Sequence, residues 1–305
     1  MGLDSLMATS TRTVIEGREL SVSNLGKVLF PRSGFTKGEL IDYYVRVAGV
    51  MLPHLRERPL TMKRFPDGVE GKSFFEKHMP SHAPDWVRSV GVPSNDGRDV
   101  IPYVMVDDLP TLAWAANLGT VELHVPLWHV GRHRKLPARP DFMVFDLDPG
   151  ESTTIVECCV VAGYVMDQLE KDGVEHFAKT SGSKGLQLYT AVGPKTTWDG
   201  LREHAYDIAR KLESEHPELV VSNMRKSLRR GRVLIDWSQN HPAKTTVAVY
   251  SVRAMPTPTV STPVTPAEVH RCATEKDPGL LRFETEDVLR RVESDGDLFA
   301  PLGLP

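Results

Sequence analysis

The stretch at residues 142–150 restricts the fold of this chain more than any other, because a short apolar run there ends in two aspartates. Residues 142–145 read Phe-Met-Val-Phe, which is typical of a buried strand, and Asp-Leu-Asp-Pro-Gly follows at once. Side chains two residues apart in a strand point to the same side, so Asp146 and Asp148 share one face. Adjacent carboxylates repel each other unless a cation lies between them, and hard oxygen ligands select Mg²⁺ or Mn²⁺. The alternative is a plain turn rich in Asp, Pro and Gly after a strand.

Helix and strand patterns alternate on both sides of this stretch. Thr36 and Glu39 form a capping box that predicts a helix through about Leu52, and Asp108 with Pro110 begins a second helix. Hydrophobic periodicity predicts further helices at 155–169 and 199–215, and strands at 121–127, 174–179, 186–191, 233–237 and 245–250. This alternation predicts a mixed α/β fold in which helices flank β-sheets.

Composition excludes several classes of protein. No apolar stretch approaches the roughly 18 residues that cross a bilayer, so we expect no membrane partner. Of the three cysteines, Cys158 and Cys159 are adjacent within a predicted helix and read as packing residues, which excludes a disulfide framework and fits a cytoplasmic protein. Prolines at 256, 258, 263 and 266 predict an extended connector rather than a helix.

Charge is unevenly distributed along the chain. The whole sequence has 37 Lys and Arg against 40 Asp and Glu, a net charge of −3 that argues against a nucleic-acid partner. Residues 225–253, however, carry seven basic residues and one acid, Asp236. A basic run of this kind is either a solvated face or a surface for phosphates.

A second polar feature is the loop Thr-Ser-Gly-Ser-Lys-Gly at residues 180–185, which lies between two predicted strands. Its two glycines permit a tight turn whose backbone N–H groups can converge on an anion, and Ser181 and Lys184 add a hydroxyl and a positive charge. The spacing differs from a Walker A loop, and no Ser-Asp-Asn element accompanies the Ser-x-x-Lys pattern of acyl-enzymes. A plain hairpin connection is the alternative, whereas polyphosphate is the ligand that the loop favours.

Asp236 is a lone acid in an apolar strand inside the basic segment, where it is either a buried partner of an arginine or a third metal carboxylate. Together with Asp146 and Asp148 it would complete a site for two cations. Metal carboxylates, a polyphosphate loop and a basic surface together indicate nucleotidyl transfer.

At this point the sequence is similar to a known family. The similarity is carried by FDLDPG (145–150), TSGSKGLQLYT (180–190) and SLRRGRVLIDWSQN (227–240), and continues in SNLGKVLFP (23–31), TKGELIDYY (36–44), GKSFFEKH (71–78), ELHVP (122–126) and KTTVAVYSVR (244–253). These segments resemble the polymerase domain of bacterial DNA ligase D and stand-alone bacterial primase-polymerases, which belong to the archaeo-eukaryotic primase superfamily. The resemblance implies one primase-polymerase domain at residues 12–305 with a primase-like core of sheets and helices, after a disordered N-terminus at residues 1–11.

The resemblance also implies an activity and its partners. The expected enzyme is a template-dependent DNA repair polymerase that fills short gaps or extends ends on 5′-phosphorylated DNA, prefers ribonucleotides and uses two Mn²⁺ or Mg²⁺ ions. Gapped or broken DNA and nucleoside triphosphates are the expected partners, with Ku and a separate DNA ligase as further candidates. Such an enzyme would be cytoplasmic and associated with the nucleoid.

Site residues follow from the positions that match the family. The metal carboxylates are Asp146, Asp148 and Asp236. The residues expected to bind the incoming nucleotide are His124, Ser181, Lys184, Gln187, Arg253, Lys63, Arg229 and Gln239. Those expected to contact DNA are Asn24, Lys27 and Lys37, which resemble a pocket for a 5′-phosphate, and Phe74 and Phe75, which resemble the pair that stacks on a template base. Lys37 lies in the first turn of a predicted helix, where free N–H groups also favour an anion.

Two departures from the family leave other functions open. Gln187 stands where the family usually has a histidine facing the triphosphate, and an amide donates a hydrogen bond but carries no charge. No Lys-x-Asp-Gly ligase signature occurs in these 305 residues, so this chain is either a free-standing polymerase or one domain of a longer protein. The alternatives are a catalytically weakened module that binds DNA ends or gaps, and a metal-dependent phosphatase built on the Asp-x-Asp pair.

Overall fold

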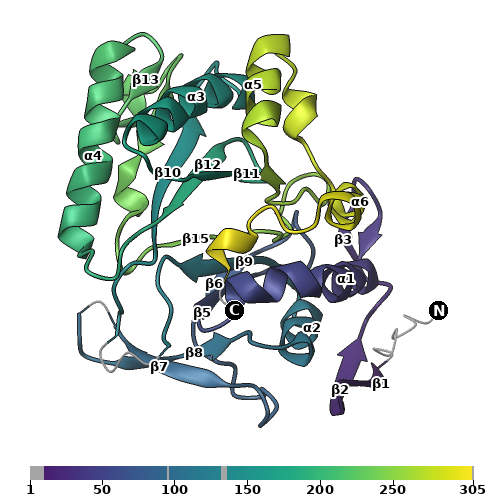
Figure 1. Ribbon diagram of the computed structural model, residues 1–305. Helices are drawn as coiled ribbons and strands as arrows, with labels where there is room; N and C mark the ends of the chain where they lie inside the picture. The colour runs from purple at the N-terminus through teal and green to yellow at the C-terminus, as the bar shows by residue number, and fades with distance from the viewer. Residues whose placement is uncertain (1–9, 95, 132–135, 304–305) are drawn as a thin grey trace.

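Two large sheets organise the computed structural model, which describes residues 10–94, 96–131 and 136–303 (Figure 1). The first sheet has the strand order β13-β14-β10-β12-β11-β16, and its neighbours are antiparallel except for the parallel pair β13 and β14. Its strands are β10 (Phe142–Pro149), β11 (Phe177–Thr180), β12 (Leu186–Ala191), β13 (Val220–Val221), β14 (Val233–Asp236) and β16 (Pro263–Val264).

The second sheet has the order β15-β9-β5-β8-β7, and β6 also pairs with β5. Its strands are β5 (Pro59–Arg64), β6 (Phe74–Glu76), β7 (Ser89–Pro93), β8 (Val100–Met105), β9 (Thr120–Pro126) and β15 (Thr245–Val247). Two small antiparallel pairs precede it, β1 (Ser10–Ile15) with β2 (Arg18–Ser23) and β3 (Val28–Phe30) with β4 (Phe35–Thr36).

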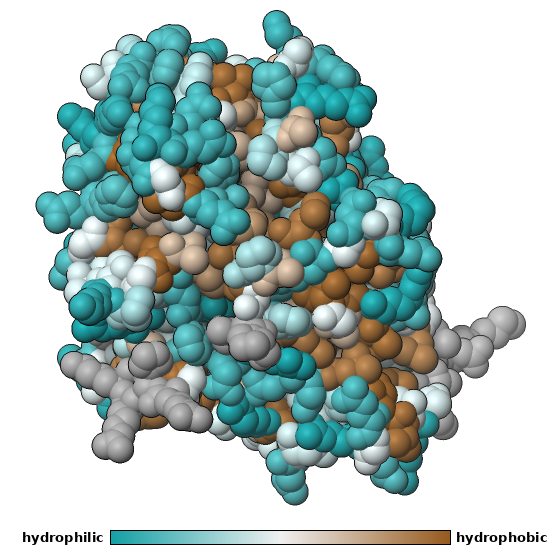
Figure 2. All heavy atoms as spheres, viewed as in Figure 1, coloured by the Kyte–Doolittle hydropathy of each residue, from teal (hydrophilic) through white to brown (hydrophobic). Residues whose placement is uncertain are grey.

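Helices are divided between the two sheets, as Figure 1 shows. The first sheet is covered by α3 (Ile155–Lys171), α4 (Trp198–Glu215) and α5 (Pro266–Glu275). The second packs against α1 (Lys37–Leu55) and α2 (Leu109–Asn117), and α6 (Thr285–Asp295) lies on α1. Short 3₁₀ turns η1 (Lys226–Leu228), η2 (Trp237–Gln239), η3 (Pro278–Leu281) and η4 (Ala300–Leu302) complete the fold. On the face in Figure 2, hydrophilic side chains gather over α4 and α5, which leaves their apolar sides for the core.

Alternation along β10 decides which side chains enter the core. Phe145 and Leu147 are fully buried against α3 and its neighbours, in a cluster that also holds Leu186 and Leu188 of β12. The intervening residues, Asp146 among them, therefore lie on the opposite face of the sheet, which faces the second sheet. A polar row thus runs along the inner face of an otherwise apolar sheet.

Most predicted elements are confirmed, and several ends differ for physical reasons. Thr36 and Asp108 cap α1 and α2 as expected, and the three cysteines are buried free thiols. The predicted strand at 245–250 ends at Val247, because Tyr250 has a φ of 65° in the left-handed region and the chain turns there. The strand at 233–237 ends one residue earlier, since Trp237 begins η2, and the strand predicted from residue 174 begins at Phe177.

The proline-rich connector and the N-terminus also need correction. Pro266 begins α5 rather than excluding a helix, because proline is accepted at the first helical position, and Pro263 belongs to β16. Ser10 and Thr11 begin β1, whereas residues 1–9 of the segment predicted to be disordered lie outside the described residues. Among the described residues, no helix is both long enough and apolar enough to cross a membrane.

Candidate active site

The three predicted metal carboxylates come from neighbouring strands of the first sheet. Asp146 on β10 lies directly opposite Asp236 on β14, and Asp148 follows two residues later on the same face. Directly opposed residues of antiparallel strands have Cβ atoms roughly 4.5–5.5 Å apart, so the register itself brings the acids together. This register pairs two residues that are ninety positions apart in the chain, so the sequence pattern alone could not predict it.

The carboxylates disfavour one another's charge. Partial burial, together with the charges of Asp148 and Asp236, raises the pKa of Asp146 to about 7, and burial with the charge of Asp236 raises that of Asp148. Among the described residues, neither side chain has an ion pair within 4.0 Å, and Gln187 is the only one that hydrogen-bonds Asp146, with Nε2 3.0 Å from Oδ1. The negative charge on this wall is therefore largely uncompensated.

Asp236 is held differently from the other two acids. Its Oδ1 accepts hydrogen bonds from the backbone and hydroxyl of Ser238, at 2.9 and 2.6 Å, and its Oδ2 accepts one from Gln239 at 3.2 Å. Gln239, predicted to bind the nucleotide, thus orients a carboxylate in this structure.

The donor set is chemically suited to a hard divalent cation, because it consists of carboxylate oxygens on one face. In the described parts of the chain, no group of three or more His, Cys, Asp or Glu side chains converges closely enough to enclose a metal ion. The acids therefore form an open edge, where a cation would need further oxygen ligands from water or substrate.

The loop between β11 and β12 forms the next wall of the site. Ser181 closes it, because its Oγ accepts hydrogen bonds from the backbone N–H groups of Ser183 and Gly185 at 3.2 and 3.1 Å. These two N–H groups are thus used within the loop rather than converging on an anion as expected. Gly185 is required by close approach, since a Cβ there would lie 2.2 Å from the carbonyl oxygen of Leu147. The Lys184 side chain is exposed at the rim.

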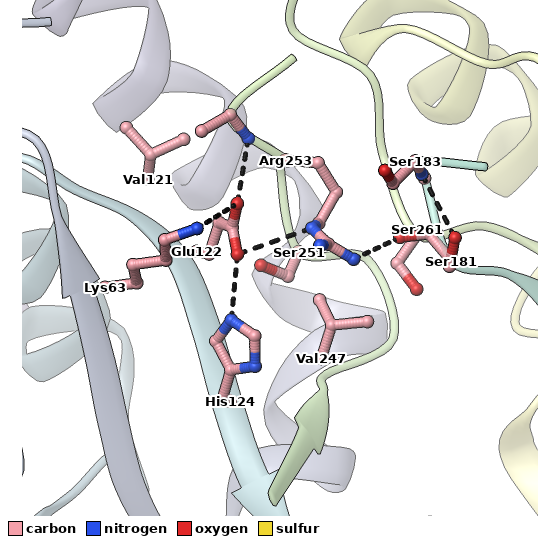
Figure 3. A network of polar contacts seen from close by, with 12 residues as sticks. Lys63, Val121, Glu122, His124, Ser181, Ser183, Val247, Ser251, Arg253 and Ser261 are labelled. Carbon is pink, nitrogen blue, oxygen red and sulfur yellow. Dashed lines mark hydrogen bonds and ion pairs between the residues drawn. The ribbon is translucent and has the colours of Figure 1, made fainter. Parts of the chain in front are cut away.

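The wall opposite the carboxylates is cationic and is organised by Glu122 of β9 (Figure 3). The Glu122 carboxylate lies 2.9 Å from Nε2 of His124, and 3.4 Å from both Nζ of Lys63 and Nε of Arg253. The side chain is only 2% exposed. Burial opposes its ionisation, but the hydrogen bond from His124 and the charge of Arg253 prevail and lower the pKa of Glu122 to about 2.

Sequence reasoning missed Glu122. It predicted a strand with a polar face there, which the structure confirms, but gave no role to the acid beside His124. Arg253 extends from Glu122 to the loop, where its Nη1 donates to the carbonyl of Ser181 at 2.6 Å. Burial lowers the pKa of His124, and Glu122 only partly offsets this effect.

These walls enclose one polar cleft of about 370 Å³. Eight predicted site residues line it, namely Asp146, Asp148, His124, Ser181, Lys184, Gln187, Arg229 and Arg253. A larger, more apolar cavity of about 760 Å³ lies on the other side of the loop and shares Pro149, Ser183, Lys184 and Gly185 with the cleft. The predicted carboxylates and Arg253 face the smaller space, which is therefore the candidate site.

Arg229 brings the basic segment to this cleft. Its Nη2 donates to the carbonyl of Met224, while its Nε is buried without a hydrogen-bond partner among the described residues. A buried guanidinium donor of this kind suits an anionic ligand. Its neighbours Arg225, Lys226 and Arg230 are exposed, and none forms an ion pair within the described structure.

The predicted 5′-phosphate residues form a separate cluster at the start of α1. Lys37 is only 7% exposed and its Nζ donates to the carbonyl of Ser23 at 2.6 Å, while Lys27 pairs with Asp67 at 3.1 Å. Burial and the nearby charge of Lys27 lower the pKa of Lys37 to about 8. Asn24 adopts a left-handed φ of 54° in the turn beside them.

The first backbone N–H groups of α1 are less available to an anion than expected. The backbone N–H of Lys37 donates to the carbonyl of Lys27, and that of Gly38 to the carbonyl of Leu25. An anion at this place would therefore be held by the lysine side chains rather than by free N–H groups of α1.

The predicted stacking pair is exposed on β6. Phe74 and Phe75 are 42% and 59% exposed, which is unusual for phenylalanine. Phe75 packs edge-on against His124 with ring centroids 5.6 Å apart, so this surface continues into the cleft. The cations of Lys63 and Arg64 lie 5.5 and 5.4 Å from the centres of the Phe75 and Phe74 rings.

Known proteins resemble this chain in sequence and fold. A sequence model of the family described as LigD, primase-polymerase domain, matches residues 36–299. The multifunctional non-homologous end joining protein LigD of Mycolicibacterium smegmatis is 41% identical over 281 residues, which are 92% of this chain and 36% of that protein. The bifunctional non-homologous end joining protein LigD of Bacillus subtilis is 30% identical over 279 residues, 91% of this chain and 43% of that protein. The chain thus spans less than half the length of these curated relatives.

A solved structure extends the likeness to the fold. The polymerase domain of Mycobacterium tuberculosis ligase D in complex with DNA has a TM-score of 0.85 to this chain at 41% identity, and the match covers 93% of this chain and 97% of that one. The expected mixed α/β fold is confirmed. With most of its length matched by the family model, the chain belongs to the LigD primase-polymerase domain family of nucleotidyltransferases.

Proposed function

We propose that this chain is a template-dependent DNA repair polymerase that fills short gaps or extends ends on 5′-phosphorylated DNA. One observation carries the proposal: a single cleft of about 370 Å³ has carboxylates on one wall and cationic side chains on the other. An incoming nucleoside triphosphate, with its metal ions, needs both kinds of wall at once. Membership of the polymerase-domain family supports the same reaction.

The cationic wall and the loop would bind the triphosphate. Arg253, Lys184 and Arg229 supply positive charge. The hydroxyl of Ser181 accepts two hydrogen bonds from backbone N–H groups, so its own proton is available to donate to the phosphates. Burial lowers the pKa of His124, so at neutral pH its ring is uncharged and its single N–H is donated to Glu122, which leaves Arg253, Lys184 and Arg229 as the charged groups of this wall. These groups offset charge that accumulates on the departing pyrophosphate.

Asp146, Asp148 and Asp236 would hold the two Mn²⁺ or Mg²⁺ ions. When bound, the ions supply Lewis acidity that favours loss of the primer 3′-hydroxyl proton and neutralises the leaving oxygens. The protein's own part is to keep the three acids on one face, to orient Asp236 through Ser238, and to align the triphosphate for attack at its α-phosphate.

DNA would be held at three places around the cleft. The lysine pair at the start of α1 suits a 5′-phosphate, and the exposed rings of Phe74 and Phe75 suit a template base, a contact typically worth roughly 1–3 kcal/mol per base without reading sequence. The exposed side chains of Arg225, Lys226 and Arg230 suit the phosphate backbone. Ribonucleotides as preferred substrates, and Ku with a separate ligase as partners in end joining, belong to this proposal through the family resemblance.

The test is primer extension on 5′-phosphorylated gapped DNA with Mn²⁺ or Mg²⁺, offering ribonucleotides and deoxyribonucleotides in parallel. We expect extension by one to a few templated nucleotides, and we expect Asp148→Ala to lower its rate by at least about 10²-fold, because one wall of the charge-stabilising site is lost. Asp207→Ala, which removes an exposed acid on α4, is the matched control and should extend as the wild type does.

Other results would identify the alternatives. Retention of gapped DNA without any extension would indicate a binding module. Release of inorganic phosphate from the nucleotide without a primer would indicate a phosphatase. Undiminished extension by Asp148→Ala would exclude the metal assignment.

A further inference from the structure

A lysine is buried directly behind the carboxylate wall. Lys179 of β11 is only 1% exposed, and its Nζ donates to Oε1 of Gln187 at 2.6 Å, to Oγ of Ser261 at 2.7 Å and to the carbonyl of Val247 at 3.1 Å. All three partners are neutral oxygens. A buried ammonium without a direct counter-ion is rare and costly, so its retention suggests a task.

That task is visible in the amide of Gln187. Its Oε1 receives Lys179 and also the hydroxyl of Tyr189 at 3.4 Å, while its Nε2 donates to Asp146 at 3.0 Å. A flipped amide would place N–H groups against an ammonium and an oxygen against a carboxylate. The lysine thus permits only one orientation of the amide, in which the donor faces Asp146.

Both polar ends of Gln187 are therefore engaged within the protein. The side chain is 4% exposed and lies opposite Asp146 in the register of β10 and β12. The contact with Asp146 is the only hydrogen bond that this carboxylate makes among the described residues. Gln187 thus supports a carboxylate in this structure, whereas the family resemblance predicted that it binds the nucleotide.

We propose that Lys179 is a positioning residue that acts through Gln187 to hold Asp146 in the orientation needed for metal binding. This inference rests on the proposed polymerase function, because it assigns Asp146 to a divalent cation. Lys179 is buried and is not among the residues that line the cleft. Its effect passes through one oriented amide, which is the kind of outer support that commonly changes metal affinity by 10–100-fold when lost.

Mn²⁺ binding to the free protein tests the inference without relying on catalysis. Free Mn²⁺ is followed by electron paramagnetic resonance during titration of wild type, Lys179→Met, Gln187→Leu and the double variant, with thermal unfolding measured in parallel. We expect each single variant to weaken binding by about tenfold and the double variant to be no weaker than either, because both remove the same support.

Matched variants separate positioning from general damage to the fold. Ser261→Ala removes another partner of Lys179 but leaves the contact with Gln187, so it should bind Mn²⁺ within about twofold of wild type, as expected for a site outside the coupled pair. Lys179→Arg enters the same cycle and keeps the test available if Lys179→Met does not fold. Lys179→Arg should weaken Mn²⁺ binding in the wild-type background, but should cause no further loss in the Gln187→Leu background.

Two outcomes overturn the inference. Either Lys179→Met binds Mn²⁺ as wild type does, or the losses of Lys179→Met and Gln187→Leu multiply in the double variant, as independent effects would. Asp146→Ala distinguishes this failure from failure of the proposed function. If wild type binds Mn²⁺ no better than Asp146→Ala, the metal site itself is absent, whereas a wild-type site that ignores Lys179 refutes only the role of the lysine.

Discussion

The two walls of the cleft each contain one buried charge of the opposite sign to the groups it supports. On the cationic wall, Glu122 stands among Lys63, His124 and Arg253. On the carboxylate wall, Lys179 stands behind Asp146 and its neighbours. The two arrangements resemble mirror images in charge, but their contacts differ.

Glu122 touches its basic partners directly, whereas Lys179 reaches Asp146 only through a neutral amide. The consequence appears in their ionisation: the pKa of Glu122 is lowered to about 2, so its charge is favoured, while burial lowers the pKa of Lys179 to about 7, so its charge is disfavoured. The cationic wall is thus ordered by one shared counter-charge, and keeps an excess of positive charge, before a triphosphate arrives. The carboxylate wall keeps its negative potential, which is the condition a divalent cation requires.

Replacing Glu122 should have the largest effect on catalysis, because it disrupts the cationic wall and leaves the carboxylate wall intact. In Glu122→Gln, three basic groups lose their common counter-charge and their fixed positions, and breaking such a buried pair typically costs about 3–5 kcal/mol. We expect kcat/KM for the incoming nucleotide to fall by roughly 10²–10³-fold, which corresponds to about 2.7–4 kcal/mol of transition-state stabilisation. Steady-state extension kinetics at fixed Mn²⁺ measure this effect.

Glu76→Gln is the matched control for that experiment. Glu76 pairs with Arg64 at 2.7 Å on β6, outside the cleft, and is only partly buried. Loss of this ion pair should change kcat/KM for the nucleotide by less than threefold, since a partly exposed ion pair contributes on the order of 1 kcal/mol or less to stability. Equal effects of both substitutions would mean that Glu122 has no special relation to the nucleotide.

The sequence predicts the carboxylate wall better than the supports behind it. The alternation at residues 142–148 is local, and local periodicity suffices to place Asp146 and Asp148 on one face of a strand. Glu122 and Arg253 are separated by 131 positions, and Lys179 and Ser261 by 82, so these contacts exist only after two sheets have packed. Hydrophobic periodicity within one strand does not predict which other polar face that strand will contact in the folded protein.

Glu122 also shows why exposure misleads in sequence patterns. A strand with alternating polar residues is typical of a half-solvated sheet, yet Glu122 on this polar face is buried against Lys63 and Arg253. Lys179 gives the converse case, because a single lysine near the end of a short strand reads as a solvent-facing residue. In both, the buried charge becomes intelligible only from its partners in space.

The stability of the protein as a function of pH should separate the two buried charges. For Lys179, with a folded pKa of about 7 and an unfolded value near 10.4, the penalty is complete below pH 7 and is relieved as pH rises, because the unfolded chain then binds one more proton. Between pH 7.5 and 9, the free energy of unfolding of wild type relative to Lys179→Met should therefore rise by up to about 1.4 kcal/mol per pH unit.

Glu122 should behave in another window. Its stabilising contribution is complete above its unfolded pKa near 4.3 and is lost as pH falls through its folded value of about 2, so Glu122→Gln should remove part of the acid sensitivity and none of the alkaline rise. Urea unfolding of the three proteins from pH 3 to 9 gives these differences. A flat difference between wild type and Lys179→Met above pH 7.5 would mean that the lysine is not held as a disfavoured charge.

The smallest effect is expected at Gln187, where the family usually has histidine. In Gln187→His, the ring can replace the amide only if one nitrogen accepts from Lys179 while the other donates to Asp146, which requires the neutral imidazole. Because that form reproduces both contacts, KM for the nucleotide and the Mn²⁺ requirement should change by less than about threefold, within the contribution of a single neutral hydrogen bond. The same substitution in a Lys179→Met background frees the ring to become protonated beside Asp146, so Mn²⁺ affinity should then fall with decreasing pH more steeply than in either single variant. A large fall in KM for Gln187→His alone would instead indicate that residue 187 meets the triphosphate directly, and the mirror relation between the two walls would not hold.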